Sequence, residues 1–276
     1  FSYLALVRTA REKGLKIHAL DASTSYQLEG AMVLNDVSPL TPRSNSLRNF
    51  YSHKTLTADI ADAPEERWVV LTEQSRMSTF NNTPGLADLH AAVAVRVEDV
   101  ALDQPARIAL DSAGAIAGDT AARGDYRVQW PTAYKAPQPV SRPAPIAPVV
   151  EHFSEYDIAP SMRDDIAQML HQPYAMDSSY TPTVPREKRA FEAFIANRGR
   201  LEKKARDAFA HYTPPEAATL PTLTADTTFE EFLRLMADGR LNLLIGEAHS
   251  HIASKALLKK HMKALKRAGY DTLYVE

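Results

Sequence analysis

The stretch LNLLIGEAHSHIASKALLKKHMKALKRAGYDTLYVE, residues 241–276, carries the clearest fold signal in the chain. LNLLI (Leu241–Ile245) is a short apolar run typical of a buried strand. Ala253–Ala268 then places apolar residues at helical spacing, and Gly269 is suited to end that helix. DTLYVE begins another strand. The order predicts a βαβ unit, with GEAHSH (Gly246–His251) as the turn after the first strand.

The segments before this unit have the same α/β pattern. A helix should end at Gly14, and a second helix should span Leu47–Ile60. Short apolar runs predict strands at Leu15–Asp21, Trp68–Thr72 and Val93–Val97. We therefore predict an α/β fold with a mostly parallel sheet and flanking helices.

A further helix is expected just before residue 241. Thr227 or Thr228 can cap its first turn, where Glu230 and Glu231 favour the positive end of the helix dipole. Gly239 can end it. The sequence thus predicts a helix that leads directly into the βαβ unit.

The chain divides into three parts. Prolines alternate with small residues over residues 134–149, which favours an extended linker, and residues 151–212 are helix-prone and charged. We assign residues 1–133 to the C-terminal half of an α/β domain, 134–224 to a Pro-rich linker with a helical segment, and 225–276 to the N-terminal βαβ part of an α/β domain. Because the chain starts inside one expected element and stops on another, we expect a longer natural polypeptide.

Composition narrows the class of function. The 276 residues carry a net charge of -2 and contain 45% hydrophobic residues, so a nucleic-acid partner is not expected. No apolar run reaches the roughly 18 residues of a membrane span, which leaves only peripheral membrane contact open. The cysteine count of 0 excludes a cysteine nucleophile and thiolate metal sites. It fits a cytoplasmic protein and equally one that is exported or injected into a host cell.

Charged and titratable side chains gather around the predicted turn. Glu247, His249 and His251 alternate after the first strand of the unit, and Glu276 follows the second strand. The carboxyl edge of a parallel sheet is where ligands bind in α/β proteins. Imidazole can exchange protons near neutral pH or bind a metal, and a nearby carboxylate can orient it. The alternative is that either histidine caps the helix or packs beside the sheet, and His261 shares an apolar helical face and is expected in the core.

Residues 243–276 resemble the opening of a superfamily that includes erythromycin esterase-like proteins, ChaN-like haem-binding proteins, TIKI metalloproteases and domains of large bacterial dermonecrotic-type toxins and effectors. The shared pattern is a strand, G-E-x-H, a helix and a strand that ends in Glu. It falls here on Gly246, Glu247, His249 and Glu276.

FSYLALVRTAREKGLKIHALD, RNFY and WVVLTEQSRMSTFNNTPGLADL look like the closing part of the same domain. There the family has a strand that ends in Asp and a helix that starts with Arg-Asn, which correspond to Asp21, Arg48 and Asn49. From the residues alone, caps and surface turns explain these three more simply. The family's second histidine is missing, because Thr72–Arg76 reads TEQSR.

The resemblance implies an esterase-like or metalloprotease-like hydrolase in a bacterial toxin or effector, a secreted or host-delivered virulence factor with an unknown host target. His249 would be a base or metal ligand, Glu247 and Glu276 would be acid/base or orienting groups, and His251 would be a second ligand. Asp21, Arg48 and Asn49 would belong to the same catalytic site. A divalent metal held by His249, His251 and Glu247 is the expected cofactor, ahead of haem. The alternatives are a haem- or metal-binding domain without turnover and a degenerate structural domain of a large toxin.

The two halves of the family pattern occur here in reversed order. Either the chain joins the end of one tandem copy to the start of the next, or it is a permuted single domain. The tandem explanation needs fewer special events and is our expectation. It predicts separate half-sheets, whereas permutation predicts that strand 241–245 pairs with strand 15–20 or 68–72.

Overall fold

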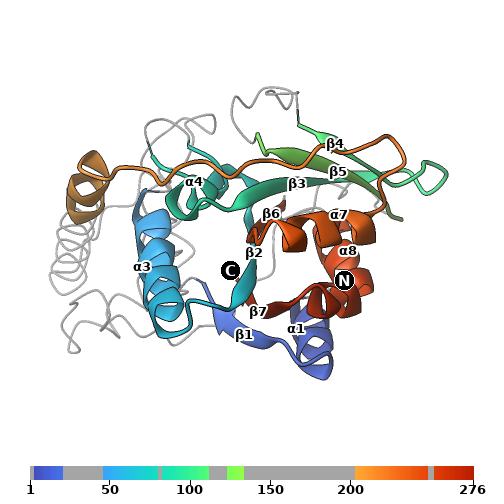
Figure 1. Cartoon of the computed structure of the whole chain (residues 1–276), viewed down its shortest axis with the longest axis horizontal. Coiled ribbons are helices and arrows are strands. Elements are labelled where there is room, and N and C mark those ends of the chain that lie inside the picture. The colour runs from blue at the N-terminus through green and yellow to red at the C-terminus, as the bar shows by residue number, and fades with distance from the viewer. Residues whose placement is uncertain (1–2, 21–45, 80–82, 112–122, 134–202, 248–251) are drawn as a thin grey trace, which may run out of the picture. The chain divides into compact units, whose positions relative to one another are not determined.

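The computed structural model describes residues 3–20, 46–79, 83–111, 123–133, 203–247 and 252–276 (Figure 1). Its helices are α1 (Tyr3–Glu12), α3 (Ser46–Asp62), α4 (Leu86–His90), α7 (Phe229–Asp238) and α8 (Ala253–Arg267), with a 3-10 turn η1 (Gln74–Arg76). Its strands are β1 (Lys16–Ala19), β2 (Arg67–Glu73), β3 (Val93–Val100), β4 (Arg107–Leu110), β5 (Tyr126–Pro131), β6 (Leu243–Glu247) and β7 (Tyr270–Val275). The protein has an α/β fold.

The chain divides into two compact units. One contains residues 1–20, 52–137 and 213–276, and the other contains residues 21–51 and 138–212. The sheet and all of its strands belong to the first unit. In the second unit, residues 203–210 are helical and Phe209 packs edge-on against Phe50, with ring centroids 6.0 Å apart. Most of the expected Pro-rich linker and helical segment lies outside the described residues.

The strands of the described chain form one sheet in the order β1-β7-β2-β6-β3-β5-β4. Every neighbouring pair is parallel except β4 and β5. Strands from the two ends of the sequence interleave, because β6 lies between β2 and β3 while β7 lies between β1 and β2 (Figure 1). The expectation of separate half-sheets is therefore wrong for this chain. The observed pairing is the one expected of a permuted single domain.

The register shows how β2 joins the two halves. Val70 pairs with Leu244 of β6 on one side and with Tyr274 of β7 on the other. The β6-α8-β7 unit therefore crosses over β2 instead of linking adjacent strands. The centre of β2 (RWVVLTE) is apolar, and a strand in the middle of the sheet has both faces covered and both edges hydrogen-bonded. This position therefore buries the apolar residues of β2.

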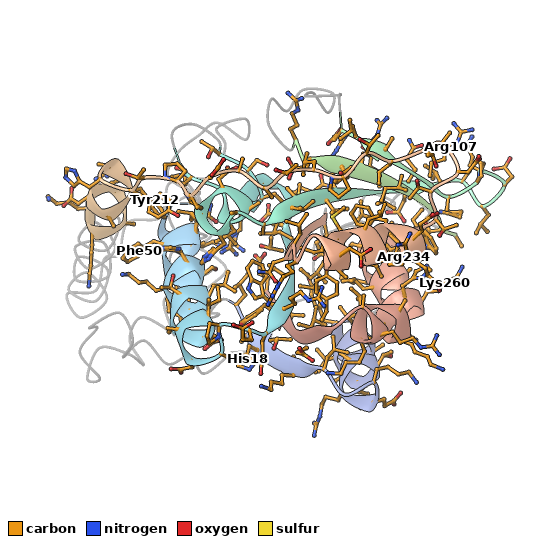
Figure 2. All side chains as sticks on the ribbon, in the orientation of Figure 1. His18, Phe50, Arg107, Tyr212, Arg234 and Lys260 are labelled. Atoms are coloured by element: carbon orange, nitrogen blue, oxygen red, sulfur yellow. The ribbon has the colours of Figure 1, made fainter. Side chains whose placement is uncertain are left out.

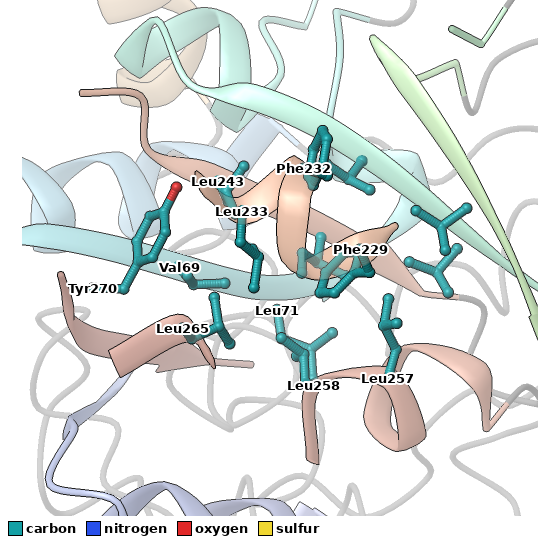
Figure 3. Close-up of a cluster of buried hydrophobic side chains, with 14 of the residues drawn as sticks. Val69, Leu71, Phe229, Phe232, Leu233, Leu243, Leu257, Leu258, Leu265 and Tyr270 are labelled. Carbon is teal, nitrogen blue, oxygen red and sulfur yellow. The ribbon is translucent and has the colours of Figure 1, made fainter. Parts of the chain in front are cut away.

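The core lies on the face of the sheet that is covered by α1, α7 and α8 (Figure 3). Alternate residues of β2 and β6 point into it, among them Val69, Leu71, Leu243 and Ile245. The helices contribute apolar faces to the same cluster, including Leu6, Phe232, Leu233, Leu257, Leu258 and Leu265. α4 and residues 52–62 of α3 lie on the opposite face, where Ser52 donates to the Leu20 carbonyl. Both faces of the central strands are thus shielded from water.

Most of the expected elements are present, with shifted ends. Thr228 caps α7 by accepting a hydrogen bond from the Glu231 amide at 3.2 Å, as predicted. Gly14 and Gly269 adopt positive φ angles of 77° and 85°, as expected of glycines that end helices. The strand predicted at Leu241–Ile245 runs instead over Leu243–Glu247, so Gly246 and Glu247 are strand residues and not turn residues.

His261 of α8 is a core residue, as predicted, with 8% exposure. Its ring lies between Phe229 and Trp130, with centroid distances of 5.1 and 5.4 Å. The neighbouring Lys260 of α8 (Figure 2) places its ammonium 4.8 Å from the Trp130 ring centroid. Burial lowers the pKa of His261, an effect that Glu230, 3.6 Å away, partly opposes.

Candidate functional site at the carboxyl edge of the sheet

Three glutamates occupy the carboxyl ends of neighbouring strands. Glu73 ends β2, Glu247 ends β6, and Glu276 follows β7 directly. Glu73 and Glu247 are register partners, and the Glu73 amide donates to Glu276 Oε2 at 2.9 Å. The carboxyl ends of parallel strands meet at one edge, where α/β proteins bind ligands. The structure therefore brings Glu247 and Glu276 to the edge predicted for them.

Glu247 is completely buried. Its Oε1 accepts a hydrogen bond from the Tyr3 hydroxyl of α1, and its Oε2 accepts from the Ser254 hydroxyl at 3.2 Å. Lys255 forms an ion pair with the same Oε2, and its side chain is only 7% exposed. The Lys255 ammonium also lies 4.7 Å from the centroid of the Tyr3 ring. Because a buried charge is tolerated only when it is paired and hydrogen-bonded, this set of donors holds the carboxylate in one orientation.

Glu276 is held in a comparable way by different residues. The Thr72 hydroxyl donates to its Oε2 at 2.7 Å, in addition to the Glu73 amide. Its Oε1 lies 3.2 Å from Nη1 of Arg76, a fully buried side chain. The Arg76 guanidinium donates in turn to the Ser52 hydroxyl of α3. Arg76 therefore connects the end of β7 to a helix on one face of the sheet.

The two carboxylates lie on opposite faces of the sheet. Glu247 follows Ile245 by two residues and so points to the α8 face, where its partners are. Glu276 contacts Thr72, which alternates with the core residue Leu71 and so points to the α3 face. The predicted βαβ unit implies that its two strands are neighbours, which is wrong because β2 lies between β6 and β7. The end of β2 therefore lies between the two carboxylates.

Gly246 allows close packing beside Glu247. A Cβ at this position would lie 2.2 Å from the Met77 sulfur and 2.7 Å from its methyl carbon. Met77 is itself completely buried after η1. A larger residue at position 246 would therefore force the buried Met77 side chain to move.

The other predicted site residues fall into two groups. Asp21, His249 and His251 lie outside the described residues. Arg48 and Asn49 are each 1% exposed on α3, but they belong to the second unit. Within the described ranges, no group of three or more His, Asp or Glu side chains could hold a metal ion. The expected roles of these residues in catalysis and metal binding remain predictions.

Sequence reasoning missed the cations that hold the two glutamates. Lys255 lies in the first turn of α8, where a lysine normally suggests a solvated helix face, and Arg76 lies in a segment read as a loop. One signal was available for Lys255. Its neighbours Ala253, Leu257 and Leu258 are apolar, so a helical projection places the lysine beside the core-facing side.

The fold and this edge define an α/β protein whose parallel sheet carries two anchored glutamates. Comparisons with protein-family models, with curated proteins and with solved structures gave no match. Within the described part of the chain, no helix has the length and apolarity needed to cross a membrane.

Proposed function

We propose that the carboxyl edge of β2, β6 and β7 is the active site of a hydrolase, and that the chain is part of a bacterial toxin or effector. The observation that carries the first proposal is the pair of cation-anchored glutamates at the ends of parallel strands, of which Glu247 is fully buried and Glu276 has a side chain that is 9% exposed. The second rests on the sequence resemblance alone.

In this proposal His249, two residues after Glu247, accepts the proton of the attacking water or ligates a divalent cation. His251 is the second candidate ligand. Glu247 is the orienting carboxylate, because Lys255, Ser254 and Tyr3 already hold it in place. A fixed carboxylate that orients an imidazole raises the basicity of the ring and sets its tautomer.

Glu276 acts in the proposal from the other side of β2. Its carboxylate is positioned by Arg76, Thr72 and the Glu73 amide, so it can exchange a proton or orient a substrate group without first reorganising. Arg76 is a positioning residue in this account, because its contacts are with Glu276 and Ser52.

The test uses the purified chain with p-nitrophenyl esters and fluorogenic peptides, with added Zn²⁺ or Mn²⁺ and with chelator. Wild type is expected to turn over at least one class of substrate. His249→Ala should lower kcat by ~100-fold or more, as loss of a general base does. His211→Ala is the matched control, because His211 is exposed in the second unit.

Glu247→Gln keeps the shape of the side chain and removes its charge, so it tests orientation separately. It also leaves the Lys255 ammonium without its carboxylate and so lowers stability, and it should lower kcat under conditions in which the far-UV circular dichroism spectrum matches that of wild type. The proposal would be overturned if wild type hydrolysed nothing under any of these conditions. It would also be overturned if His249→Ala and Glu247→Gln matched wild type.

A further inference from the structure

One histidine of α3 and one at the end of α4 are in contact, away from Glu247 and Glu276. His53 of α3 and His90 at the end of α4 place Nδ1 and Nε2 3.1 Å apart. Their ring centroids are 4.9 Å apart and the planes are tilted by 51°. Trp68 at the start of β2 packs edge-on against His90 with a centroid distance of 6.0 Å. Neither histidine belongs to a sequence pattern that predicts a role, and 37 positions separate them.

The surroundings keep both rings neutral. Burial lowers the pKa of His53, assisted by the charge of Lys54. Burial also lowers the pKa of His90 to about 4, with a smaller effect from His53. Neutral imidazole is the form that binds metal ions. Because both pKa values are lowered, protons compete only weakly with a metal ion for the free ring nitrogens at neutral pH.

We propose that His53 and His90 together bind a divalent transition-metal cation of the class that prefers imidazole, such as Zn²⁺. Two zinc–nitrogen bonds of about 2.05 Å to atoms 3.1 Å apart enclose an angle of about 98°. This angle lies between the square-planar value of about 90° and the tetrahedral value of about 109°. The spacing of the two nitrogens therefore fits one shared cation.

Among the described residues, His53 and His90 are the two protein ligands of this site, because no group of three or more His, Asp or Glu side chains could hold a metal ion there. Water molecules would complete the coordination of the cation, in the way that water takes the open position of catalytic zinc sites. When the cation binds, the ring that donates this hydrogen bond carries its proton on its other nitrogen instead, so both rings stay neutral and offer a lone pair, and the cation links α3 to α4. The site is separate from the glutamates of the proposed hydrolase, so neither proposal depends on the other.

The test is isothermal titration of the purified chain with Zn²⁺. His53→Gln and His90→Gln should each remove one binding event or weaken it by ~10-fold or more, because even outer-shell changes cost that much at metal sites. The double variant His249→Ala/His251→Ala is the control, and it should keep this event. Circular dichroism shows whether each variant folds. If one of the two fails to fold, the other still tests the proposal.

Two spectroscopic readouts locate the cation. In nitrogen-15 spectra of the imidazoles, Zn²⁺ should shift Nδ1 of His53 and Nε2 of His90. In a Trp130→Phe variant, Trp68 is the remaining tryptophan of the two in the chain, and Cu²⁺ should quench it strongly only when both His53 and His90 are present. The proposal is overturned if Zn²⁺ binding is absent, is unchanged in both histidine variants, or disappears only in the His249/His251 control.

Discussion

Replacing Lys255 with methionine should leave Glu247 as a buried charge without its cation. The side chains are 7% and 0% exposed, so water cannot replace the ammonium. Removing one partner of a buried ion pair costs about 3–5 kcal/mol. Because Tyr3 and Ser254 still donate to Glu247, we expect the lower end, about 3 kcal/mol. With a urea m-value of about 2 kcal/mol per M, the unfolding midpoint should fall by about 1.5 M.

The assay is urea unfolding followed by tryptophan fluorescence and circular dichroism. Lys263→Met is the matched control, because Lys263 is an exposed lysine of the same helix, and it should change stability by less than about 0.5 kcal/mol. The double variant Lys255→Met/Glu247→Gln should recover at least half of the loss, since the charge is then gone, the Gln oxygen can accept from the Tyr3 hydroxyl and the Gln amide nitrogen can donate to the Ser254 hydroxyl. If Lys255→Met matched the Lys263 control, the pair would behave like a solvated surface pair and the reasoning would be refuted.

Three more predictions concern other parts of the first unit. Gly246→Ala should destabilise the fold by about 1–3 kcal/mol in urea unfolding, because the new Cβ meets the Met77 sulfur, and the same substitution should cost less when it is made in a Met77→Ala background. Thr228→Ala should cost about 1 kcal/mol by removing the cap of α7, and Thr228→Ser should restore most of it. The lowered pKa of His261 means that the unfolded chain takes up its proton first as the pH falls below 6.5, so this residue's contribution to stability is full above that pH and is lost as the pH falls toward the folded-state pKa. His261→Leu should therefore give a shallower stability profile between pH 7 and pH 5 than wild type, and equal slopes would contradict the burial argument.

Local signals in the sequence were enough to predict the α/β fold. Gly14 and Gly269 end helices at positive φ, and Thr228 caps α7, because these depend on neighbouring residues in the chain. The strand, helix and strand predicted for residues 241–276 are also present, although β6 begins and ends two residues later than predicted. That shift matters for the site, because it makes Glu247 the last residue of a buried strand.

The antiparallel edge of the sheet was missed. β5 (YRVQWP) alternates apolar Tyr126, Val128 and Trp130 with polar residues, so this part of the sequence does carry a strand pattern. β4 is only four residues long and mostly exposed, so its pattern carries little information. The short α4 was likewise hidden in a segment that begins with turn residues.

The order of strands could not be obtained from local patterns. The residues around β2 do not predict that this strand pairs with both β6 and β7, because the pairing depends on contacts between residues about 200 positions apart. The same limit applies to the glutamates. The sequence placed Glu247 and Glu276 at a common edge, but their anchors Tyr3 and Arg76 come from distant segments that only the folded sheet brings together.

The most direct test of the account is whether β2 lies between β6 and β7, because this places the two glutamates on either side of one strand. Cross-strand amide nuclear Overhauser effects in the deuterated, nitrogen-15-labelled chain measure it. We predict contacts from the residues around Val70 to those around Leu244 and also to those around Tyr274. Direct contacts between β6 and β7, with none from either to β2, would contradict the interleaved sheet and the site built on it.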